Sequence, residues 1–332
     1  MKISVMGTGY VGLVSGTCLA ERGHQVTCID IRSEVVQEIN AGRPPIHEMG
    51  LDNLLRSARD KGMLSATTDA KTAILDSDVT LICVGTPTVD GRMDMSQIVA
   101  AAKEIGSALA SKRGYHVVAV KSTVLPGTTE GPVKAAIESH SGKKVGGGWG
   151  LCMNPEFLRE GRAVEDFRVP DRIVVGATDS MTEEVFLNVY ADFTCPKLVT
   201  TPRTAEMIKY VSNSLLATMI SFSNEIGNMC SAVPGVDARL VWKGVHLDRR
   251  LTPINGQVGG AAGVTEYLWH GLGFGGSCFP KDVAALRSFG RTVGEQTRML
   301  DAVLDINADQ PLRMVALLEK ELSLAGKTVA VL

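Results

Sequence analysis

The chain has 332 residues, of which 45% are hydrophobic and 21% are charged, and its formal net charge is −2. This length exceeds one ordinary hydrophobic core and predicts two or three domains. The near-neutral charge argues against nucleic acid or an anionic membrane as the main partner, and we expect neither a signal peptide nor a membrane span.

The first two hundred residues alternate short apolar segments with helical ones. Five segments are typical of strands buried on both faces: KISVMG, QVTCID, VTLICVG, HVVAVKS and RIVVGA. Amphipathic or alanine-rich stretches such as 95–110 lie between several of them. This alternation indicates βαβ units. We therefore expect an α/β fold whose N-terminal domain, residues 1–202, is a Rossmann-like parallel sheet.

Helical patterns replace the strands from about residue 203. The stretch 204–231 has apolar residues at helical spacing and predicts one long helix. Further helices are predicted within 234–245, over 280–289 and over 299–321, with a glycine-rich irregular segment at 251–276. Residues 203–325 thus form a predicted central helical domain. The last residues, GKTVAVL (326–332), have the pattern of a new buried strand.

Glycine spacing after the first strand predicts a dinucleotide site. Gly7, Gly9 and Gly12 have GxGxxG spacing, and the second strand ends at Asp30. The first glycine permits a tight turn, the second lets pyrophosphate approach the backbone, and the third lets the helix pack on the strand. The helix N-terminus then attracts the phosphates. Asp30 would accept from the ribose hydroxyls and favours NAD, whereas Arg32 leaves NADP as an alternative.

Two later strand ends offer further residues on the cofactor side. CVGTP (83–87) and KSTVLPG (121–127) each follow a predicted strand. Because ligands of open α/β sheets bind beyond the carboxyl ends of strands, Thr86 and Thr123 are candidates. Ordinary turn chemistry is the alternative explanation for both threonines.

Seven cysteines, an odd number without CxxC spacing, argue against a disulfide framework and a metal cluster. Most lie in apolar runs, as small core residues do, so a reducing cytoplasmic location is expected. Cys278 differs, because it lies in GLGFGGSCFPKD (271–282), just before a helix that would begin near Pro280. The helix N-terminus and nearby Lys281 favour a nucleophilic thiolate. A buried structural cysteine is the alternative.

A nucleophilic thiol beside NAD indicates one kind of reaction. An alcohol loses a hydride to give an aldehyde, but the aldehyde needs an addition to its carbonyl before a second hydride can leave. Thiolate addition gives a thiohemiacetal, and its oxidation gives a thioester that water converts to an acid. The sequence therefore suggests a four-electron oxidation of an alcohol.

Two segments carry polar pairs that are four residues apart. Glu156 and Glu160 share a face if NPEFLREG is helical, and such a carboxylate could hold water or act as a base. A solvated helix end is the alternative. Lys209 and Asn213 lie on the predicted long helix and could donate to a developing alkoxide. An exposed lysine is the alternative there.

Together these motifs resemble the UDP-glucose/GDP-mannose dehydrogenase family. The matching stretches are GTGYVGL, CVGTP, KSTVLPGTT, NPEFLREG, AEMIKYVSN and GFGGSCFPKD, in the family's order over nearly the whole chain. The last stretch looks most like the UDP-glucose branch. The resemblance implies oxidation of the C6 alcohol of a nucleotide sugar, UDP-glucose to UDP-glucuronate, with two NAD. It also implies a homodimer formed through the central helix.

The resemblance implies roles for further residues. The expected catalytic residues are Cys278, Lys209, Asn213, Asp282, Glu160 and Thr123. The expected cofactor-binding residues are Gly7, Gly9, Tyr10, Val11, Gly12, Asp30, Arg32, Gly85, Thr86, Thr123, Glu160 and Lys281. The expected substrate-binding residues are Glu156, Phe157, Leu158, Lys209, Asn213, Arg250, Phe274, Gly275 and Gly276. Of these, Arg250 matches an arginine that reaches across the family's dimer, and no metal is expected.

Two stretches depart from the family's pattern. The segment 251–267 is longer than the family's, which could reshape the substrate pocket or the interface. GKTVAVL resembles only the first strand of the family's C-terminal Rossmann-like domain, so we expect residues 326–332 to begin a nucleotide-sugar-binding domain whose remainder is absent.

Two other functions remain open on the sequence. A two-electron dehydrogenase of the β-hydroxyacid type also uses a lysine and an asparagine on a helix, but it needs no Cys278. A non-catalytic NAD-binding redox sensor would use Cys278 as an oxidisable thiol.

Overall fold

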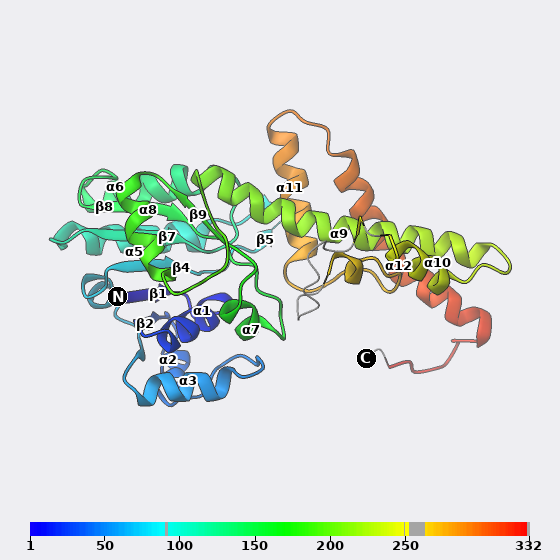
Figure 1. The fold of residues 1–332 in the computed structure, drawn as a ribbon, viewed down its shortest axis with the longest axis horizontal. Helices are drawn as coiled ribbons and strands as arrows, with labels where there is room; N and C mark the ends of the chain where they lie inside the picture. Colours follow the sequence, from blue (N-terminus) through cyan, green and yellow to red (C-terminus); the bar gives the residue numbers. More distant parts are fainter. Residues whose placement is uncertain (90–91, 249, 252–262, 331–332) are drawn as a thin grey trace. The chain divides into compact units, whose positions relative to one another are not determined.

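The computed structural model describes residues 1–89, 92–248, 250–251 and 263–330. The chain divides into two compact units, the first made of Met1–Val89 with Met93–Lys209 and the second continuing from Tyr210 (Figure 1). The division falls inside the long helix α9 (Pro202–Ala232) and not after residue 202. Ala205 accounts for this, because it is fully buried in the core of the first unit.

The first unit is built on an eight-stranded sheet in the order β10-β9-β8-β7-β4-β1-β2-β3. The strands are β1 (Lys2–Met6), β2 (Gln25–Ile29), β3 (Leu64–Thr67), β4 (Val79–Ile82), β7 (His116–Val120), β8 (Trp149–Met153), β9 (Ile173–Ala177) and β10 (Lys197–Thr200). Short strands β5 (Thr88–Val89) and β6 (Arg92–Met93) follow β4. The predicted Rossmann-like α/β fold is confirmed. Only β9 and β10 run against the other strands, since β8 and β9 pair antiparallel.

Three strands of this sheet lack a clear sequence signal. β3 is short and half exposed, and β10 is an exposed edge strand. β8 is fully buried but follows a run of glycines that is typical of a turn. Its Gly150 has a packing reason, because a Cβ there would lie 2.0 Å from Oγ1 of Thr182 and 2.4 Å from the hydroxyl of Tyr115.

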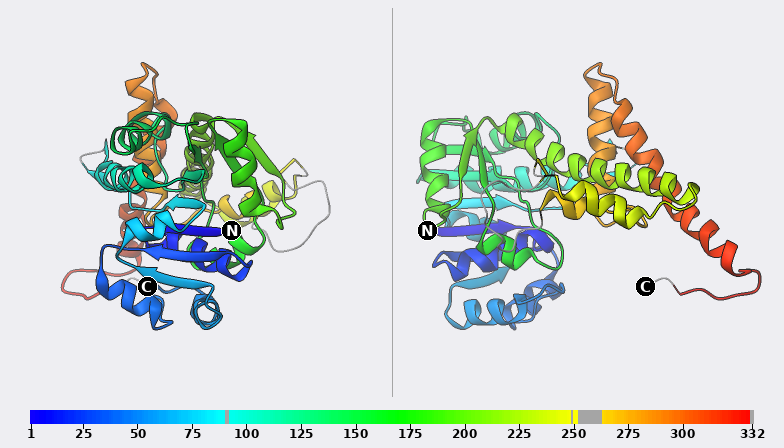
Figure 2. Two further views of the ribbon diagram at one scale, coloured as in Figure 1. Left: turned by 90° about the vertical axis from the view of Figure 1, so that its left-hand side faces the viewer. Right: turned by 45° about the vertical axis from the view of Figure 1, so that its right-hand side comes forward.

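Two layers of helices cover the two faces of the sheet (Figure 2). One face packs on α1 (Tyr10–Glu21), α3 (Leu51–Asp60), α7 (Ala163–Arg168) and α8 (Ser180–Leu187). The other packs on α4 (Ala70–Leu75), α5 (Ser96–Ser111), η1 (Thr129–Val133) and α6 (Lys134–Ser141). Helices α2 (Ser33–Asn40) and η2 (Asn188–Tyr190) complete the unit. Successive strand residues enter opposite cores, as a doubly covered sheet requires.

The second unit is helical, as predicted. It continues α9 and contains α10 (Ala238–His246), η3 (Val264–Tyr267), α11 (Phe279–Thr292) and α12 (Arg298–Glu321). The longer segment 251–267 lies mostly outside the described residues, and its described part holds η3. The predicted strand at 326–332 is absent from its described residues, 326–330, which form a turn and an irregular segment. A single strand there has no neighbour to bond with. Whether these residues begin a further domain stays a prediction. None of the described helices has the length and apolarity needed to cross a bilayer.

A buried polar chain stabilises the sheet interior of the first unit. Ser4 and Thr80 hydroxyls lie 2.7 Å apart, and the Thr80 hydroxyl lies 2.8 Å from Nε2 of His116. Nδ1 of His116 lies 3.0 Å from the Ser77 carbonyl oxygen, which only an N–H can satisfy. Because burial keeps the ring of His116 neutral, its Nε2 accepts from the Thr80 hydroxyl. Burial, with nearby Lys112, lowers the pKa of His116 to about 3.

We expect His116 to make the fold acid-sensitive. Because its pKa is lower in the folded state, its contribution to stability is present above the unfolded pKa and is lost as the pH falls. Between pH 7 and pH 5 the free energy of unfolding should drop by about 2 kcal/mol through this residue. Urea unfolding of His116→Gln should show a smaller drop, whereas exposed His140→Gln should behave as the parent. Equal pH dependence in all three chains would contradict this account.

Candidate active site

Strand register brings several predicted site residues to one edge of the sheet. Ile29, Met6, Ile82, Val120 and Met153 lie in one row across β2, β1, β4, β7 and β8. The residues that follow this row, among them Gly7, Lys121 and Asn154, therefore lie along the same edge. This is the edge at which open α/β sheets bind ligands.

A cavity of about 550 Å³ opens at this edge. Its walls are the turn after β1, the end of β2, the end of β4 and one face of α5. Gly7 starts the turn with φ +93°, a left-handed conformation that favours glycine. Its amide donates to the carbonyl of Ile29 at 2.8 Å, which fixes the turn against β2.

The other two glycines of the turn fit a bound pyrophosphate for different reasons. A Cβ at Gly12 would lie 1.9 Å from the carbonyl oxygen of Gly7, so α1 packs as closely as only glycine allows. A Cβ at Gly9 would meet no atom within 4 Å, which leaves the backbone open to a ligand. The first turn of α1, with Tyr10 and Val11, has neither an acidic residue nor a side-chain cap. Its amides are therefore suited to phosphate oxygens.

Asp30 is positioned to bind ribose hydroxyls. It is nearly buried in the cavity wall and accepts from the Thr8 amide at 3.1 Å and from the Arg32 amide at 3.0 Å. Nε of Arg32 donates to the same carboxylate at 3.1 Å. Burial alone would raise the pKa of Asp30, but the bonds from Arg32 and Thr8 hold it below its usual value. The site therefore keeps an ionised acceptor, which fits NAD.

The predicted threonines join two strand ends. Oγ1 of Thr86 donates to the carbonyl of Thr123 at 2.8 Å, so the loops after β4 and β7 are bonded together. Gly85 lines the cavity, and Thr123 is half-buried. Thr86 thus stabilises the turn, which was the alternative to a role in cofactor binding. Its role in cofactor binding stays a prediction.

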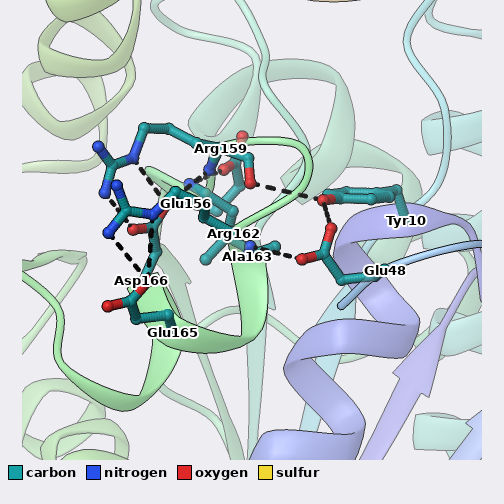
Figure 3. Close-up of polar contacts among 9 residues, drawn as sticks. Tyr10, Glu48, Glu156, Arg159, Arg162, Ala163, Glu165 and Asp166 are labelled. Carbon is teal, nitrogen blue, oxygen red and sulfur yellow. Dashed lines mark hydrogen bonds and ion pairs between the residues drawn. The ribbon is translucent and has the colours of Figure 1, made fainter. Parts of the chain in front are cut away.

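The segment 154–162 is not a helix, so Glu156 and Glu160 do not share a helical face. The condition on which their pairing depended is therefore not met. Glu156 is buried, and Glu160 is exposed in a turn. Side chains from outside the segment hold it, because it has no helical hydrogen bonds. Figure 3 shows one example, in which Nε and Nη2 of Arg159 donate to the carboxylate of Asp166 at 3.0 and 2.5 Å.

Lys209 is buried, not exposed, and forms an ion pair with Glu156. Its Nζ lies 2.9 Å from Oε1 of Glu156 and 5.5 Å from the ring centre of Phe157. Burial alone would raise the pKa of Glu156, but the Lys209 ammonium and the Leu158 amide hold it below its usual value. The Leu158 amide donates at 2.6 Å. Glu156, Phe157, Leu158 and Lys209 thus lie together, and their expected role in substrate binding stays a prediction.

A buried lysine beside this pair was missed by sequence reasoning. Lys121 follows β7, and its Nζ donates to Oδ1 of Asn154 at 3.0 Å. The hydroxyl of Tyr190 donates to the same oxygen at 2.7 Å. Burial lowers the pKa of Lys121. Its signal was a lysine directly after the apolar run VVAV of β7, at a strand end where ligand-binding residues occur.

In the second unit, Cys278 is placed as predicted. It is the residue immediately before α11, with Pro280 in the first turn. All seven cysteines are free, and Cys278 is the exposed one. Its sulfur lies 3.6 Å from the Ser277 hydroxyl. An exposed thiol at a helix N-terminus suits a nucleophile and excludes the alternative of a buried structural cysteine.

Two predicted residues of the second unit, Asn213 and Lys281, converge on the carboxylate of a third, Asp282. Asp282 is 1% exposed. Nδ2 of Asn213 donates to its Oδ2 at 2.6 Å, and Nζ of Lys281 donates to its Oδ1 at 2.5 Å. Asp282 lies one helical turn after Cys278, and its amide donates to the Cys278 carbonyl at 2.8 Å. Lys281 is therefore bound to Asp282 here, whereas its expected role is in cofactor binding.

Side-chain amides hold the glycine-rich loop that precedes Cys278. Asn307 accepts from the Phe274 amide at 2.7 Å and donates to the Phe274 carbonyl at 2.9 Å. Asn224 and Gln310 bind the amide and the carbonyl of Gly271, each at 2.7 Å. Gly273 and Gly276 have φ of +95° and +76°, and Gly275 is exposed. The sequence offered no signal for these amides.

Arg250 contacts an acidic residue close to it in the sequence. It is exposed, and its guanidinium pairs with Asp248 two residues earlier, with Nε 3.0 Å from each carboxylate oxygen. Its predicted reach across a dimer is not tested by a single chain. Among the residues that the structure describes, no cluster of His, Cys, Asp or Glu could hold a metal ion.

Comparison with known proteins shows what this chain is similar to. Residues 1–194 match the NAD-binding domain, and 203–309 the central domain, of the UDP-glucose/GDP-mannose dehydrogenase family. UDP-glucose 6-dehydrogenase AglM of Haloferax volcanii is 44% identical over 100% of this chain and 75% of its own length. GDP-mannose 6-dehydrogenase of Pseudomonas aeruginosa is 42% identical over 93% and 69%. The solved UDP-glucose dehydrogenase of Pyrobaculum islandicum has a TM-score of 0.89 and 43% identity, covering 96% of this chain and 71% of that one.

The two glycines of the turn should respond in opposite ways to alanine. Gly9→Ala should keep the thermal stability of the parent, because its methyl group meets nothing, but should weaken NAD binding by on the order of tenfold or more. Gly12→Ala should lower the free energy of unfolding by about 1–3 kcal/mol, because its methyl group overlaps the Gly7 carbonyl. Calorimetry and NAD titration measure both effects. Equal stability losses, or full NAD affinity in Gly9→Ala, would contradict this assignment.

Proposed function

This chain belongs to the UDP-glucose/GDP-mannose dehydrogenase family, and we propose that it oxidises the C6 alcohol of a nucleotide sugar to a carboxylate. The observation that carries the proposal is the exposed Cys278 thiol, one helical turn before the Asn213–Asp282–Lys281 cluster, in a chain that also has the NAD cavity. A simple alcohol dehydrogenase has no use for such a thiol.

UDP-glucose is the substrate that we propose. In favour are the Haloferax volcanii relative and the Pyrobaculum islandicum structure, both of which bear that sugar in their names. GDP-mannose is the competing substrate, because the Pseudomonas aeruginosa relative is nearly as similar. Turnover with a panel of UDP- and GDP-sugars decides between them.

NAD, when bound by the turn after β1 and by Asp30, supplies the hydride acceptor at each of two oxidations. In the first, the C6 alcohol loses a hydride and a proton and becomes an aldehyde. The Cys278 thiolate then adds to the carbonyl carbon and gives a thiohemiacetal. Loss of a second hydride and a proton gives a thioester. Water attacks the thioester, displaces the Cys278 sulfur and leaves a carboxylate, so two hydrides leave and one water oxygen enters.

The polar residues of α9 and α11 are proposed to steady oxygen and move protons. Lys209 has three donors and gives one to Glu156, so others remain for the oxygen at C6. Asn213 gives one of its two amide hydrogens to Asp282 and keeps one for the same oxygen. Asp282 would orient the attacking water, with Glu160 and Thr123 assisting proton transfer.

The remaining expected residues are proposed to bind the sugar nucleotide through backbone and shape. Phe157 and Leu158 would contact it beside the Lys209–Glu156 pair, and Phe274, Gly275 and Gly276 would contact it from the cysteine loop. The ring of Phe157 is held by the Arg172 guanidinium, 3.8 Å from its centre. Arg250 is proposed to bind substrate from the partner subunit of a dimer.

Cys278→Ser should separate the two oxidations. The parent should form two NADH for each UDP-glucose consumed, whereas the variant should form at most one and lose carboxylate production by on the order of 10³-fold. Cys195→Ser, which changes a partly buried cysteine of the first unit, is the matched control and should form two. One NADH per sugar in the parent would support the two-electron reaction and defeat the proposal.

The proposed dimer rests on a stripe of exposed apolar side chains along α9. Val211, Leu215, Phe222 and Met229 are 49–60% exposed and fall on one side of the helix at spacings of four and seven residues. Thr218 and Glu225 interrupt the stripe. A contiguous patch of exposed apolar side chains is typical of a protein interface.

Charging this stripe should produce monomers. Phe222→Glu would place a carboxylate in the proposed interface and should halve the mass measured by sedimentation at micromolar concentration. Met181→Glu makes the same change at an exposed apolar residue of α8 and should leave the mass unchanged. A parent chain that sediments as a monomer would end this part of the proposal.

A further inference from the structure

A buried glutamate outside the predicted site joins two parts of the first unit. Glu48 lies in the loop between α2 and α3 and is 1% exposed, whereas its neighbour Met49 is 77% exposed. The loop therefore turns this one carboxylate inward. Figure 3 shows it between Tyr10 at the start of α1 and the backbone of Ala163 at the start of α7.

The carboxylate of Glu48 is satisfied by three donors from distant parts of the chain. Oε1 accepts from the Ala163 amide at 3.0 Å, and Oε2 accepts from the Gly161 amide at 2.9 Å. Oε2 also accepts from the hydroxyl of Tyr10. Hydrogen bonds to a charged acceptor in a buried place are strong, because water cannot replace them.

Tyr10 is the residue through which this carboxylate reaches the cofactor side. It is the first residue of α1 and directly follows Gly9, which lines the dinucleotide cavity. Its hydroxyl also accepts from the Gly161 amide at 3.1 Å. Burial and the bond to Glu48 raise the pKa of Tyr10, so the hydroxyl remains a donor. The start of α1, Glu48 and Gly161 therefore form one bonded group.

The segment that Glu48 holds is the one that carries the proposed substrate contacts. It is irregular between 154 and 162. Near its start, Glu156 forms an ion pair with Lys209 and accepts a hydrogen bond from the Leu158 amide, which fixes this end. At its far end Gly161 has φ +86° and binds Glu48 and Tyr10. Phe157, Leu158 and Glu160 lie between these two attachments.

We propose that Glu48 is a positioning residue that couples NAD at the start of α1 to the substrate-binding segment 156–161. A dinucleotide that fixes the first turn of α1 also fixes Tyr10, then Glu48, then the amides of Gly161 and Ala163. NAD bound there would therefore hold the segment more tightly in the form that the structure shows. The importance of this coupling for turnover rests on the function proposed above, but the coupling itself does not.

Hydrogen exchange with and without NAD tests the coupling without any sugar substrate. NAD should slow exchange in the first turn of α1 in every variant that binds it. In the parent, NAD should also slow exchange of a peptide covering 159–164, by about fivefold or more. In Glu48→Gln and Tyr10→Phe, NAD should still slow exchange in the first turn of α1 but should no longer slow exchange of the peptide 159–164. Glu165→Gln is the matched control. Glu165 lies on the exposed side of α7 and pairs with Arg162, the residue before this helix, so the variant should behave as the parent.

Kinetics then distinguish a positioning role from a merely structural one. Glu48→Gln and Tyr10→Phe should raise KM for UDP-glucose by about fivefold or more while leaving NAD affinity within about twofold. The double variant should be no worse than the poorer single variant, since both changes break one linkage. Tyr10→Phe alone carries the test if Glu48→Gln does not fold.

Two results would overturn the proposal. One is protection of 159–164 by NAD in the variants to the same extent as in the parent, or its absence in the parent. The other is a lowered melting temperature in Glu48→Gln and Tyr10→Phe with unchanged KM, which would make Glu48 a structural cap only. If no sugar is oxidised but the exchange pattern holds, the proposed function fails and the coupling stands.

Discussion

The first unit depends on one constraint, the alignment of its parallel strands. Met6, Ile82, Val120 and Met153 lie in one row, so the loops that follow them share an edge. A slip of one residue in any of these strands would turn its buried side chains to the opposite face and move its loop along the edge. The dinucleotide turn, Asp30 and the Lys209–Glu156 pair therefore all rest on hydrogen bonds of the sheet.

Much of this edge follows from local patterns in the sequence. Apolar strands, the spacing of Gly7, Gly9 and Gly12, and an acid at the end of the second strand each indicate a position without knowledge of the rest of the chain. Glu48 and Lys121 could not be identified in this way, because their partners are far away in sequence. The condition set for the segment after β8, that it be helical, fails for a related reason. Bonds to Lys209, Asp166 and Glu48 hold it, and these replace the helical bonds that its spacing suggested.

The second unit is organised differently, since side-chain amides hold its glycine-rich loop beside a small apolar cluster. Its buried apolar cluster is small, with Ala217, Phe274, Val283 and Val303 at its centre. Amides of α9 and α12 hold the backbone of the glycine-rich loop instead, while the thiol that follows stays exposed. An amide clamp fixes the path of the chain without covering its surface, which suits a residue that must meet a bulky substrate. Such amides leave no periodic trace in a sequence, so the place of Cys278 before a helix was foreseeable but the amides that hold its loop were not.

Gly176 in β9 determines how closely the start of α9 can approach the sheet. The helix starts directly over Gly176 in β9, where a Cβ would lie 2.6 Å from the carbonyl oxygen of Thr201 and 2.8 Å from Cβ of Ala205. Even a methyl group there would act as a wedge beneath the first turn of the helix. Because α9 is continuous, the wedge would tilt its next turns and draw the Lys209 ammonium away from Glu156. The absence of a side chain at Gly176 of β9 thus sets how closely α9 lies on the sheet, and so where Lys209 meets Glu156.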